Sequence, residues 1–343
     1  MADPVLAVDR LSVGFADGRR TVPAVHDVSF TLAAGETLAL VGESGSGKSV
    51  TSLAVMRLLP PAPRTRVTGS AVLRGRDGTA HDLLALPDAA MRALRGDAIA
   101  MIFQEPMTSL NPVHRIGDQI AESARHHRGL DRRAALKRAE GLLDRVGIPD
   151  AARRLRAYPH ELSGGMRQRV MIAMALACDP AVLIADEPTT ALDVTVQSQI
   201  LDLLKGLQHE TGMGLVFITH NLGVVAEIAD RVMVMYGGRI VERGGVVPVM
   251  TGPLMPYTRG LIASVPRLDL AGGEMVSIPG TVPDPRRPPP GCAFAPRCSF
   301  ALPDPCDAAV PGLDEARAGQ AVRCHRWRAV AAEADGAALE ISA

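Results

Sequence analysis

Residues 42–49 constrain the fold of this chain more than any other stretch of its sequence. They read Gly-Glu-Ser-Gly-Ser-Gly-Lys-Ser, which matches the phosphate-loop pattern. An apolar run at 36–41 comes before the loop, and residues with helical spacing follow it from Ser49 to Leu59. This order of strand, loop and helix is typical of a nucleotide-binding α/β fold, whereas a glycine-rich turn met by chance would not require it.

The residue types within the loop suit a bound phosphate and its magnesium ion. Glycines let the backbone N–H groups and the N-terminus of the following helix approach the phosphates closely. We expect Lys48 to contact the β- and γ-phosphates of ATP and the Ser49 hydroxyl to ligate Mg²⁺, which prefers oxygen ligands. The other loop residues assigned to the nucleotide site are Gly42, Ser44, Gly45 and Gly47.

Two more apolar runs, at 181–185 and 215–219, predict buried strands that are each followed by a helix-like segment. Short apolar strands that alternate with helices imply a mostly parallel sheet. The first run leads into Asp186 and Glu187, at the sheet edge where open α/β folds bind ligands. We expect Asp186 to hold the magnesium shell and Glu187 to polarise the attacking water. A solvated acidic pair that merely ends a strand is the alternative.

Changes in composition and in hydrophobic pattern along the sequence divide the chain into three parts. We assign residues 1–104 and 161–250 to a phosphate-loop NTPase core of the α/β class. Residues 105–160 lose the strand signal and become rich in Arg and Ala, which predicts an inserted helical subdomain. Residues 251–343 form a loop-rich C-terminal extension with much proline and four of the five cysteines. No internal repeat is found, so we expect one core.

Composition limits the partners and the location of the chain. Lys plus Arg and Asp plus Glu number 37 each, so no global charge attracts nucleic acid or an anionic membrane. The first residues do not resemble a secretory signal, and no run approaches the ~18 apolar residues of a membrane helix. We therefore expect a cytosolic protein, with any membrane-spanning parts on other chains.

Residues 162–168, Leu-Ser-Gly-Gly-Met-Arg-Gln, distinguish among the families that use a phosphate loop. They resemble the signature sequence of the ATP-binding-cassette superfamily and lie just before the acidic strand, as in that family. Three more family motifs match in order: Gln104 resembles the Q-loop glutamine, residues 191–193 (Ala-Leu-Asp) the D-loop, and His220 the switch histidine. The resemblance covers roughly residues 5–250.

The resemblance implies a role for the signature residues Ser163, Gly164 and Gly165. In the family they bind the γ-phosphate of an ATP held by a second cassette, so two cassettes enclose two ATP molecules and one signature implies a dimer. Backbone N–H groups at the start of a helix suit this role.

The resemblance also implies that Gln104 contacts the magnesium ion and the attacking water, and that His220 holds Glu187 and the water in register. Asp193 would belong to the nucleotide site, and Phe15 resembles the aromatic that stacks on adenine. A core position for Phe15 is the alternative, because an aromatic side chain packs as readily as it stacks. A lone histidine is likewise more often structural, but His220 follows a predicted strand beside the other site residues.

Three further stretches resemble the oligopeptide/dipeptide importer subfamily, whose members also carry nickel or other small solutes. They are residues 107–112 (Met-Thr-Ser-Leu-Asn-Pro), 256–259 (Pro-Tyr-Thr-Arg) and 291–298 (Gly-Cys-Ala-Phe-Ala-Pro-Arg-Cys). The resemblance implies ATP-driven import at the cytoplasmic face of the membrane. The implied partners are a related but different cassette, two permease subunits and an extracytoplasmic solute-binding protein. Residues 107–112 would help to dock a permease helix, with an ordinary surface loop as the alternative.

Cys292, Cys298, Cys306 and Cys324 lie close together in the proline-rich extension, which is too irregular to build a core of its own. A reducing compartment disfavours disulfides, and the spacings match neither common zinc sites nor bacterial ferredoxins. The residues alone therefore leave open a metal centre, a structural zinc and unpaired thiols. The subfamily resemblance implies a 4Fe-4S cluster. We expect Cys178 to be a small core residue.

A soluble cassette ATPase that acts on nucleic acid or ribosomes is the main alternative function. The basic stretch at 125–138 could favour it, but Asp131 and the nearby Glu140 and Asp144 are typical of a solvated helix face. Such proteins tend to carry long coiled coils or two cassettes, and neither is found. A regulatory binding module, the second alternative, would lack the catalytic acid Glu187.

Overall fold

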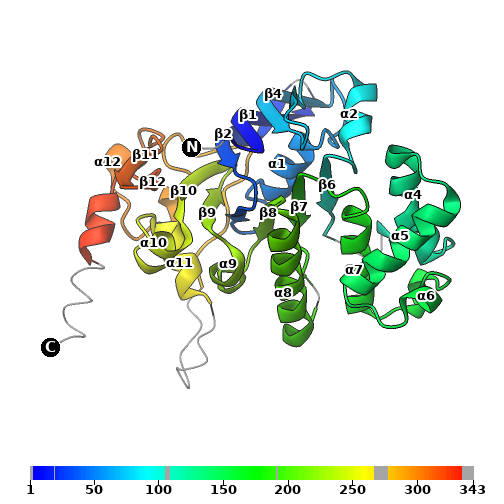
Figure 1. Cartoon of the computed structure of the whole chain (residues 1–343). Helices are drawn as coiled ribbons and strands as arrows, with labels where there is room; N and C mark the ends of the chain where they lie inside the picture. The colour runs from blue at the N-terminus through cyan, green and yellow to red at the C-terminus, as the bar shows by residue number, and fades with distance from the viewer. Residues whose placement is uncertain (1–2, 19, 105–108, 191, 266–276, 334–343) are drawn as a thin grey trace. The chain divides into compact units, whose positions relative to one another are not determined.

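The computed structural model describes residues 3–18, 20–104, 109–190, 192–265 and 277–333. The chain divides into two compact units, and each combines helices with strands, so the predicted α/β class is confirmed (Figure 1). Unit 1 comprises Met1–Ala7, Thr31–Thr37 and Ser70–Ile218. Unit 2 comprises Val8–Phe30, Leu38–Gly69 and Thr219–Ala343.

Three parallel strands form the centre of unit 1. β7 (Val182–Asp186) lies between β6 (Ile99–Ile102) and β8 (Gly214–Thr219). All five residues of β7 are buried, as expected for a parallel strand that is covered on both faces. The register pairs Asp186 with Ile218, so β7 delivers its acidic end to the carboxyl edge of these strands. The strands predicted from the apolar runs are confirmed.

Helices make up much of the remainder of unit 1. α4, α5 and α7 pack against one another, and the described residues between 109 and 161 contain no strand (Figure 1). Gly117 of α4 lies directly against the backbone of Leu155, since an added Cβ at Gly117 would lie 2.8 Å from the Leu155 carbonyl oxygen. The helices of unit 1 include α2 (Asp88–Leu94), α4 (Ile116–Arg128), α5 (Arg132–Arg145), α6 (Ala151–Arg154), η1 (Pro159–Glu161), α7 (Gly164–Ala175) and α8 (Val194–Thr211). In the same unit the end of β4 (Thr65–Arg74) pairs antiparallel with β5 (Ala80–Asp82).

Unit 2 contains the strand that leads into the predicted phosphate loop. This strand, β3 (Thr37–Val41), runs parallel to β9 (Arg231–Tyr236), which turns back into the antiparallel β10 (Arg239–Gly245). β10 also pairs with β12 (Gln320–Val322), and β12 with β11 (Asp314–Arg317). Most of the neighbouring strands β1 (Leu6–Asp17) and β2 (Arg20–Leu32) also belongs to this unit. Its helices include α1 (Lys48–Val55), α9 (Leu222–Ile228), α10 (Val246–Thr251), α11 (Pro256–Ala263), η2 (Ala295–Arg297) and α12 (Pro303–Cys306), and residues 327–333 are also helical.

The C-terminal extension shares one hydrophobic core with the strands of unit 2. Tyr257 and Phe294 from the extension are buried in the same cluster as Val41 at the end of β3 and Tyr236 at the end of β9. Burial of large aromatic side chains is a major source of stability, so the extension stabilises the strand that precedes the predicted loop.

A buried carboxylate also links β10 to the extension. Glu242 is fully buried and accepts hydrogen bonds from the backbone N–H groups of Leu254 (2.7 Å) and Met255 (3.2 Å) and from Nε2 of Gln320 (2.9 Å). Burial raises the pKa of Glu242, and these hydrogen bonds lower it in part. Glu242 therefore links the start of α11 and the neighbouring strand β12 to β10.

Within the described residues, no helix has the length and apolar character needed to cross a bilayer. The sequence reasoning missed β9, which lies parallel to β3, and the antiparallel strands β10 to β12. β10 carries charged residues among short apolar runs, which weakens the strand signal. The division of the chain at residues 104, 160 and 250 stays a prediction.

Candidate active site

The predicted phosphate loop of unit 2 runs from the end of β3 to the start of α1. An added Cβ at Gly42 would collide with the backbone oxygen of Met235, and one at Gly47 would lie 2.9 Å from the oxygen of Ala24. Gly47 also has a φ of 108°, in the region that side chains disfavour. Gly45 has open space at its Cβ position. The glycine pattern therefore reflects a tightly enclosed loop base and an open loop tip.

Lys48 is the first residue of α1 and is 5% exposed. Its Nζ donates hydrogen bonds to the carbonyl oxygens of Gly42 (2.7 Å) and Glu43 (3.0 Å), so the ammonium group lies across the loop. The buried Oγ of Ser46 has no hydrogen-bond partner among the described residues. Ser44 is exposed, and Ser49 follows Lys48 in the first turn of α1. These groups fit a loop that receives phosphate oxygens.

The acidic residues of unit 1 lie where β7 ends. Asp186 is buried, and Glu187 has a φ of 47°, in the left-handed region. The Glu187 N–H donates to the Ile218 carbonyl (2.9 Å), which holds this uncommon backbone conformation. Its Oε2 accepts hydrogen bonds from Gln104 Nε2 (3.2 Å) and from the Thr190 hydroxyl (2.9 Å). The structure thus brings Gln104 and Glu187 together.

Thr190 is a residue of this group that the sequence reasoning missed. It follows Glu187 by three positions, so a hydroxyl there can reach back to the carboxylate across a single turn of chain. The contact fixes the orientation of the Glu187 carboxylate. The sequence does show a hydroxyl residue at this position, directly after Asp186-Glu187-Pro-Thr. The sequence reasoning considered only the two acidic residues of this segment.

The predicted signature and D-loop residues begin two helices that touch. Ser163 is the N-cap of α7, and its Oγ accepts a hydrogen bond from the Met166 N–H (3.4 Å). Asp193 is the N-cap of α8 and accepts from the Val196 N–H (2.9 Å). An added Cβ at Gly165 would lie 2.8 Å from the Val196 side chain, so glycine allows this close approach. Gly164 is exposed with open space around its Cβ position.

Two predicted residues lie in unit 2 apart from its loop. His220 is exposed directly after β8, and Phe15 is half-buried in β1. Their predicted roles stay predictions, as does the docking role of residues 107–112. Residues 107 and 108 of that stretch, and Ala191 of the D-loop, lie outside the described residues.

The four clustered cysteines lie in unit 2, whereas Cys178 is fully buried in the core, as predicted. Burial, with a smaller contribution from the other three thiols, raises the pKa of Cys324 to about 12. Among the described residues, no group of three or more His, Cys, Asp or Glu side chains could hold a metal ion. The predicted 4Fe-4S or zinc centre therefore has no support from the structure.

Hydrogen bonds within the extension hold the backbone at three of the clustered cysteines. The Cys292 N–H donates to the Cys306 carbonyl (2.7 Å), and the sulfur of Cys324 accepts a hydrogen bond from the Arg326 N–H (3.3 Å). These bonds order the backbone around Cys292, Cys306 and Cys324.

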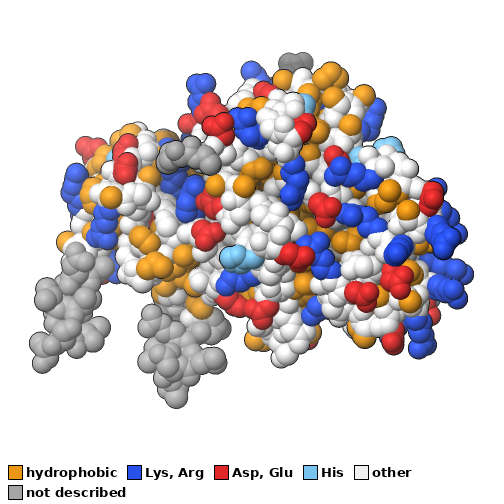
Figure 2. All heavy atoms as spheres, viewed as in Figure 1, with side chains coloured by type: hydrophobic (Ala, Val, Ile, Leu, Met, Phe, Trp, Pro, Cys, Tyr) orange, Lys and Arg blue, Asp and Glu red, His pale blue; other side chains and the backbone are white. Residues whose placement is uncertain are grey.

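Figure 2 shows Lys and Arg side chains gathered over the helices α4 and α5 of unit 1. Several of these cations have acidic partners: Arg128 pairs with Asp97 (3.1 Å) and Arg138 with Asp179 (2.6 Å). Pairing with acidic groups of the same unit weakens their attraction for a polyanion, so the face does not favour a nucleic-acid function.

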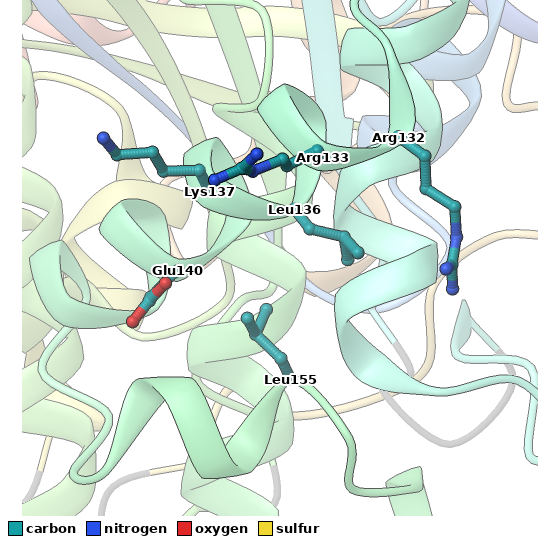
Figure 3. Close-up of a pocket in the computed structure, with 6 residues that line it drawn as sticks. All are labelled: Arg132, Arg133, Leu136, Lys137, Glu140 and Leu155. Carbon is teal, nitrogen blue, oxygen red and sulfur yellow. The ribbon is translucent and has the colours of Figure 1, made fainter.

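One hollow on this face has a volume of about 530 Å³. Leu136 and Leu155 lie at its centre, and the charged ends around them come from Arg132, Arg133, Lys137 and Glu140 (Figure 3). Arg132 also pairs with Asp118 (3.0 Å). A hollow with mixed charge and an apolar floor does not suit an anion.

Comparisons with known proteins identify relatives of both parts of the chain. Residues 25–190 match the ABC transporter family, and residues 241–306 match the C-terminal region of oligopeptide/dipeptide transporters. A putative peptide import ATP-binding protein of Brucella abortus (strain 2308) is 58% identical over 335 residues, which cover 96% of this chain and 99% of that protein. The dipeptide transport ATP-binding protein DppD of Bacillus subtilis (strain 168) is 50% identical over 322 residues, 94% of each chain.

Solved structures give the same result for the fold. A dimeric ATP-binding cassette in a post-hydrolysis state, bound to ADP and phosphate, is 27% identical with a TM-score of 0.61. The match covers 70% of the present chain and 98% of the chain of that cassette. The cassette cbiO1 of Clostridium perfringens, part of an ABC transporter complex, is 27% identical with a TM-score of 0.58 and covers 72% of this chain and 91% of that chain.

Proposed function

The chain belongs to the ATP-binding proteins of ABC transporters, in their oligopeptide/dipeptide branch, and from this membership we propose that it hydrolyses ATP to power import of peptides or similar small solutes. The observation that carries the proposal is the near-complete match to peptide import proteins, which includes the C-terminal region as well as the cassette.

The phosphate loop of unit 2 binds the substrate MgATP in this proposal. The backbone N–H groups at the open tip around Gly45 receive the phosphates, and Lys48 moves its ammonium group from the loop carbonyls to the β- and γ-phosphates. The unpartnered Ser46 hydroxyl gains an acceptor, and Ser49 ligates the magnesium ion.

Glu187 accepts the proton of the attacking water as the water adds to the γ-phosphorus and ADP leaves. Gln104 and Thr190 orient its carboxylate, and Asp186 holds the magnesium shell. His220 holds the water and Glu187 in register. Because phosphoryl transfer depends mainly on positioning and charge, these contacts account for much of the catalysis.

Two cassettes close around two ATP molecules in the proposed cycle. The N–H groups at the start of α7, behind Ser163, meet the γ-phosphate bound by the partner cassette. Hydrolysis removes this bridging group, so the dimer reopens and the permeases follow the motion. We propose a related but different cassette, two permease subunits at the cytoplasmic face of the membrane and an external solute-binding protein as partners.

Transport by the reconstituted complex tests the proposed function. We expect ATP-dependent uptake of at least one peptide from a panel of peptides, metal chelates and other small solutes, and copurification with two multispanning membrane proteins. Complexes that contain the Glu187→Gln variant serve as the control for ATP-dependent uptake. Copurification with nucleic acid or ribosomes in place of membrane proteins would contradict the proposal.

The 4Fe-4S cluster at the four cysteines belongs to the proposed function as a separate element. Its support is the pattern of the four cysteines, three of which lie in the part of the chain that matches the C-terminal region of oligopeptide/dipeptide transporters. Each thiol would ligate the cluster as a thiolate, and the ligands of a four-iron cluster stand farther apart than those of one ion. The centre lies outside the ATP motifs, so no step of hydrolysis runs through it.

Anaerobic purification tests the cluster directly. We expect brown protein with about four irons per chain, and loss of both colour and iron in Cys298→Ser. Cys178→Ala is the matched control, because it removes a cysteine from the core of unit 1 and should retain the iron. Colourless protein with one zinc, or metal-free protein with four titratable thiols in the extension, would refute the cluster.

A further inference from the structure

Arg297 in the C-terminal extension is a buried guanidinium with all five of its N–H donors in use. Nη1 and Nη2 form a two-pronged ion pair with the Glu43 carboxylate, at 2.7 and 3.0 Å. The remaining hydrogen bonds go to the carbonyl oxygens of Pro279 (2.9 Å) and Ile278 (3.3 Å) and to the Tyr236 hydroxyl (3.4 Å). Its side chain is only 4% exposed. A guanidinium with this many partners has one well-defined position.

Glu43 is the second residue of the phosphate loop, and it is held from three directions. Arg297 binds its side chain, and its backbone N–H donates to the buried Tyr257 hydroxyl at 2.8 Å. Its carbonyl oxygen accepts from Lys48 Nζ (3.0 Å) and from the Ser46 N–H (3.2 Å). The same residue therefore connects the extension to the lysine expected to bind the phosphates.

Aromatic side chains pack around the Arg297–Glu43 ion pair and restrict its movement. The rings of Tyr236, Tyr257 and Phe294 contact one another, with centroids 4.6 to 5.4 Å apart. The Arg297 guanidinium lies 5.8 Å from the Tyr236 ring centroid and 5.9 Å from that of Phe294. Hydrogen bonding to Glu43 raises the pKa of Arg297, so the charge persists at any physiological pH.

We propose that Arg297 is a positioning residue for ATP binding: through Glu43 it holds the phosphate loop in the conformation that accepts the phosphates, which makes the C-terminal extension a part of the nucleotide site. The inference rests on the proposed phosphate-binding role of residues 42–49. A loop held in place before binding loses less conformational freedom when the nucleotide arrives, and it keeps Lys48 over the phosphate position.

The test is the Kd of the full-length chain for MgATP and MgADP, measured by calorimetry at a temperature well below the thermal unfolding of every variant. We expect Arg297→Gln to raise both Kd values about tenfold. Arg259→Gln is the matched control, because Arg259 belongs to the same extension and pairs with Glu333 (3.6 Å) away from the loop. Its Kd values should stay within about twofold of wild type.

The double variant Glu43→Gln/Arg297→Gln separates positioning from simple charge. Arg297→Gln alone leaves the Glu43 carboxylate unpaired near the phosphates, which would weaken binding by repulsion. The double variant removes that repulsion and the tether together. We expect it to bind about as weakly as Arg297→Gln. Recovery of wild-type affinity would show that only charge mattered and would overturn the positioning role.

Two further variants complete the test. Tyr257→Phe removes the hydroxyl that accepts a hydrogen bond from the Glu43 N–H, and we expect it to raise the Kd values about threefold. Tyr257→Phe replaces Arg297→Gln if Arg297→Gln does not fold. Unchanged Kd values in the variant used would overturn the proposal. Lys48→Ala tests the phosphate-binding role of residues 42–49 separately. If Lys48→Ala also leaves the Kd values unchanged, the phosphate-loop assignment fails. If Lys48→Ala weakens binding and the extension variant does not, only the role of Arg297 is rejected.

Discussion

The Glu187→Gln variant is expected to bind MgATP as tightly as the wild type and to hydrolyse it at least about 100-fold more slowly, because general base catalysis contributes about 10²- to 10⁴-fold. The amide keeps the shape of the carboxylate and still accepts hydrogen bonds from Gln104 and Thr190, so the local geometry survives. It cannot take the proton of the attacking water. With ATP uncleaved, the variant should accumulate as a closed dimer.

Single-turnover hydrolysis and size-exclusion chromatography with MgATP measure both effects. Glu122→Gln is the matched control, since Glu122 is an exposed residue of α4 in the same unit and has no proposed role in hydrolysis. Its turnover should equal that of the wild type. Hydrolysis by Glu187→Gln at the wild-type rate would reject Glu187 as the general base.

The Ser163→Arg variant is expected to lose at least about 100-fold in ATP turnover while its monomer binds nucleotide normally, since loss of preorganised donors at a reacting group costs about 10²- to 10³-fold. Ser163 is exposed at the N-terminus of α7, where a long cationic side chain fits without disturbing the core. It would obstruct the approach of the N–H groups to the γ-phosphate on the partner.

Loss of the N-cap hydrogen bond also costs about 1 kcal/mol of stability, so the control must share that loss. Asp131→Arg removes the N-cap of α5 in the same unit and should leave turnover unchanged. Mixing Ser163→Arg with a cassette that carries an intact signature, such as Lys48→Ala, should restore part of the activity. If mixing fails and monomer binding is lost as well, Ser163→Arg has only unfolded the chain.

Local patterns in the sequence predicted the elements that deliver the catalytic residues. The sequence predicts the strand before the phosphate loop, β3, and also β7 and β8. Each is a short apolar run that is buried along its whole length and ends in a polar or glycine-rich segment. The position of Ser163 at the start of a helix follows from the same local chemistry of caps. Such features depend on neighbours along the chain, so a single sequence reveals them.

Contacts between distant parts of the chain were decided by the tertiary structure alone. Arg297 and Glu43 are separated by 254 positions, and no periodicity or motif predicts that one will bind the other. The burial of Glu242 among the groups of the extension, and the strands β10 to β12, likewise depend on long-range pairing. The sequence by itself therefore determined the fold class, the order of its ATP motifs and the resemblance they carry. The tertiary structure decided what supports the phosphate loop, because a buried ion pair is specified by the packing around it and not by the residues beside it in the chain.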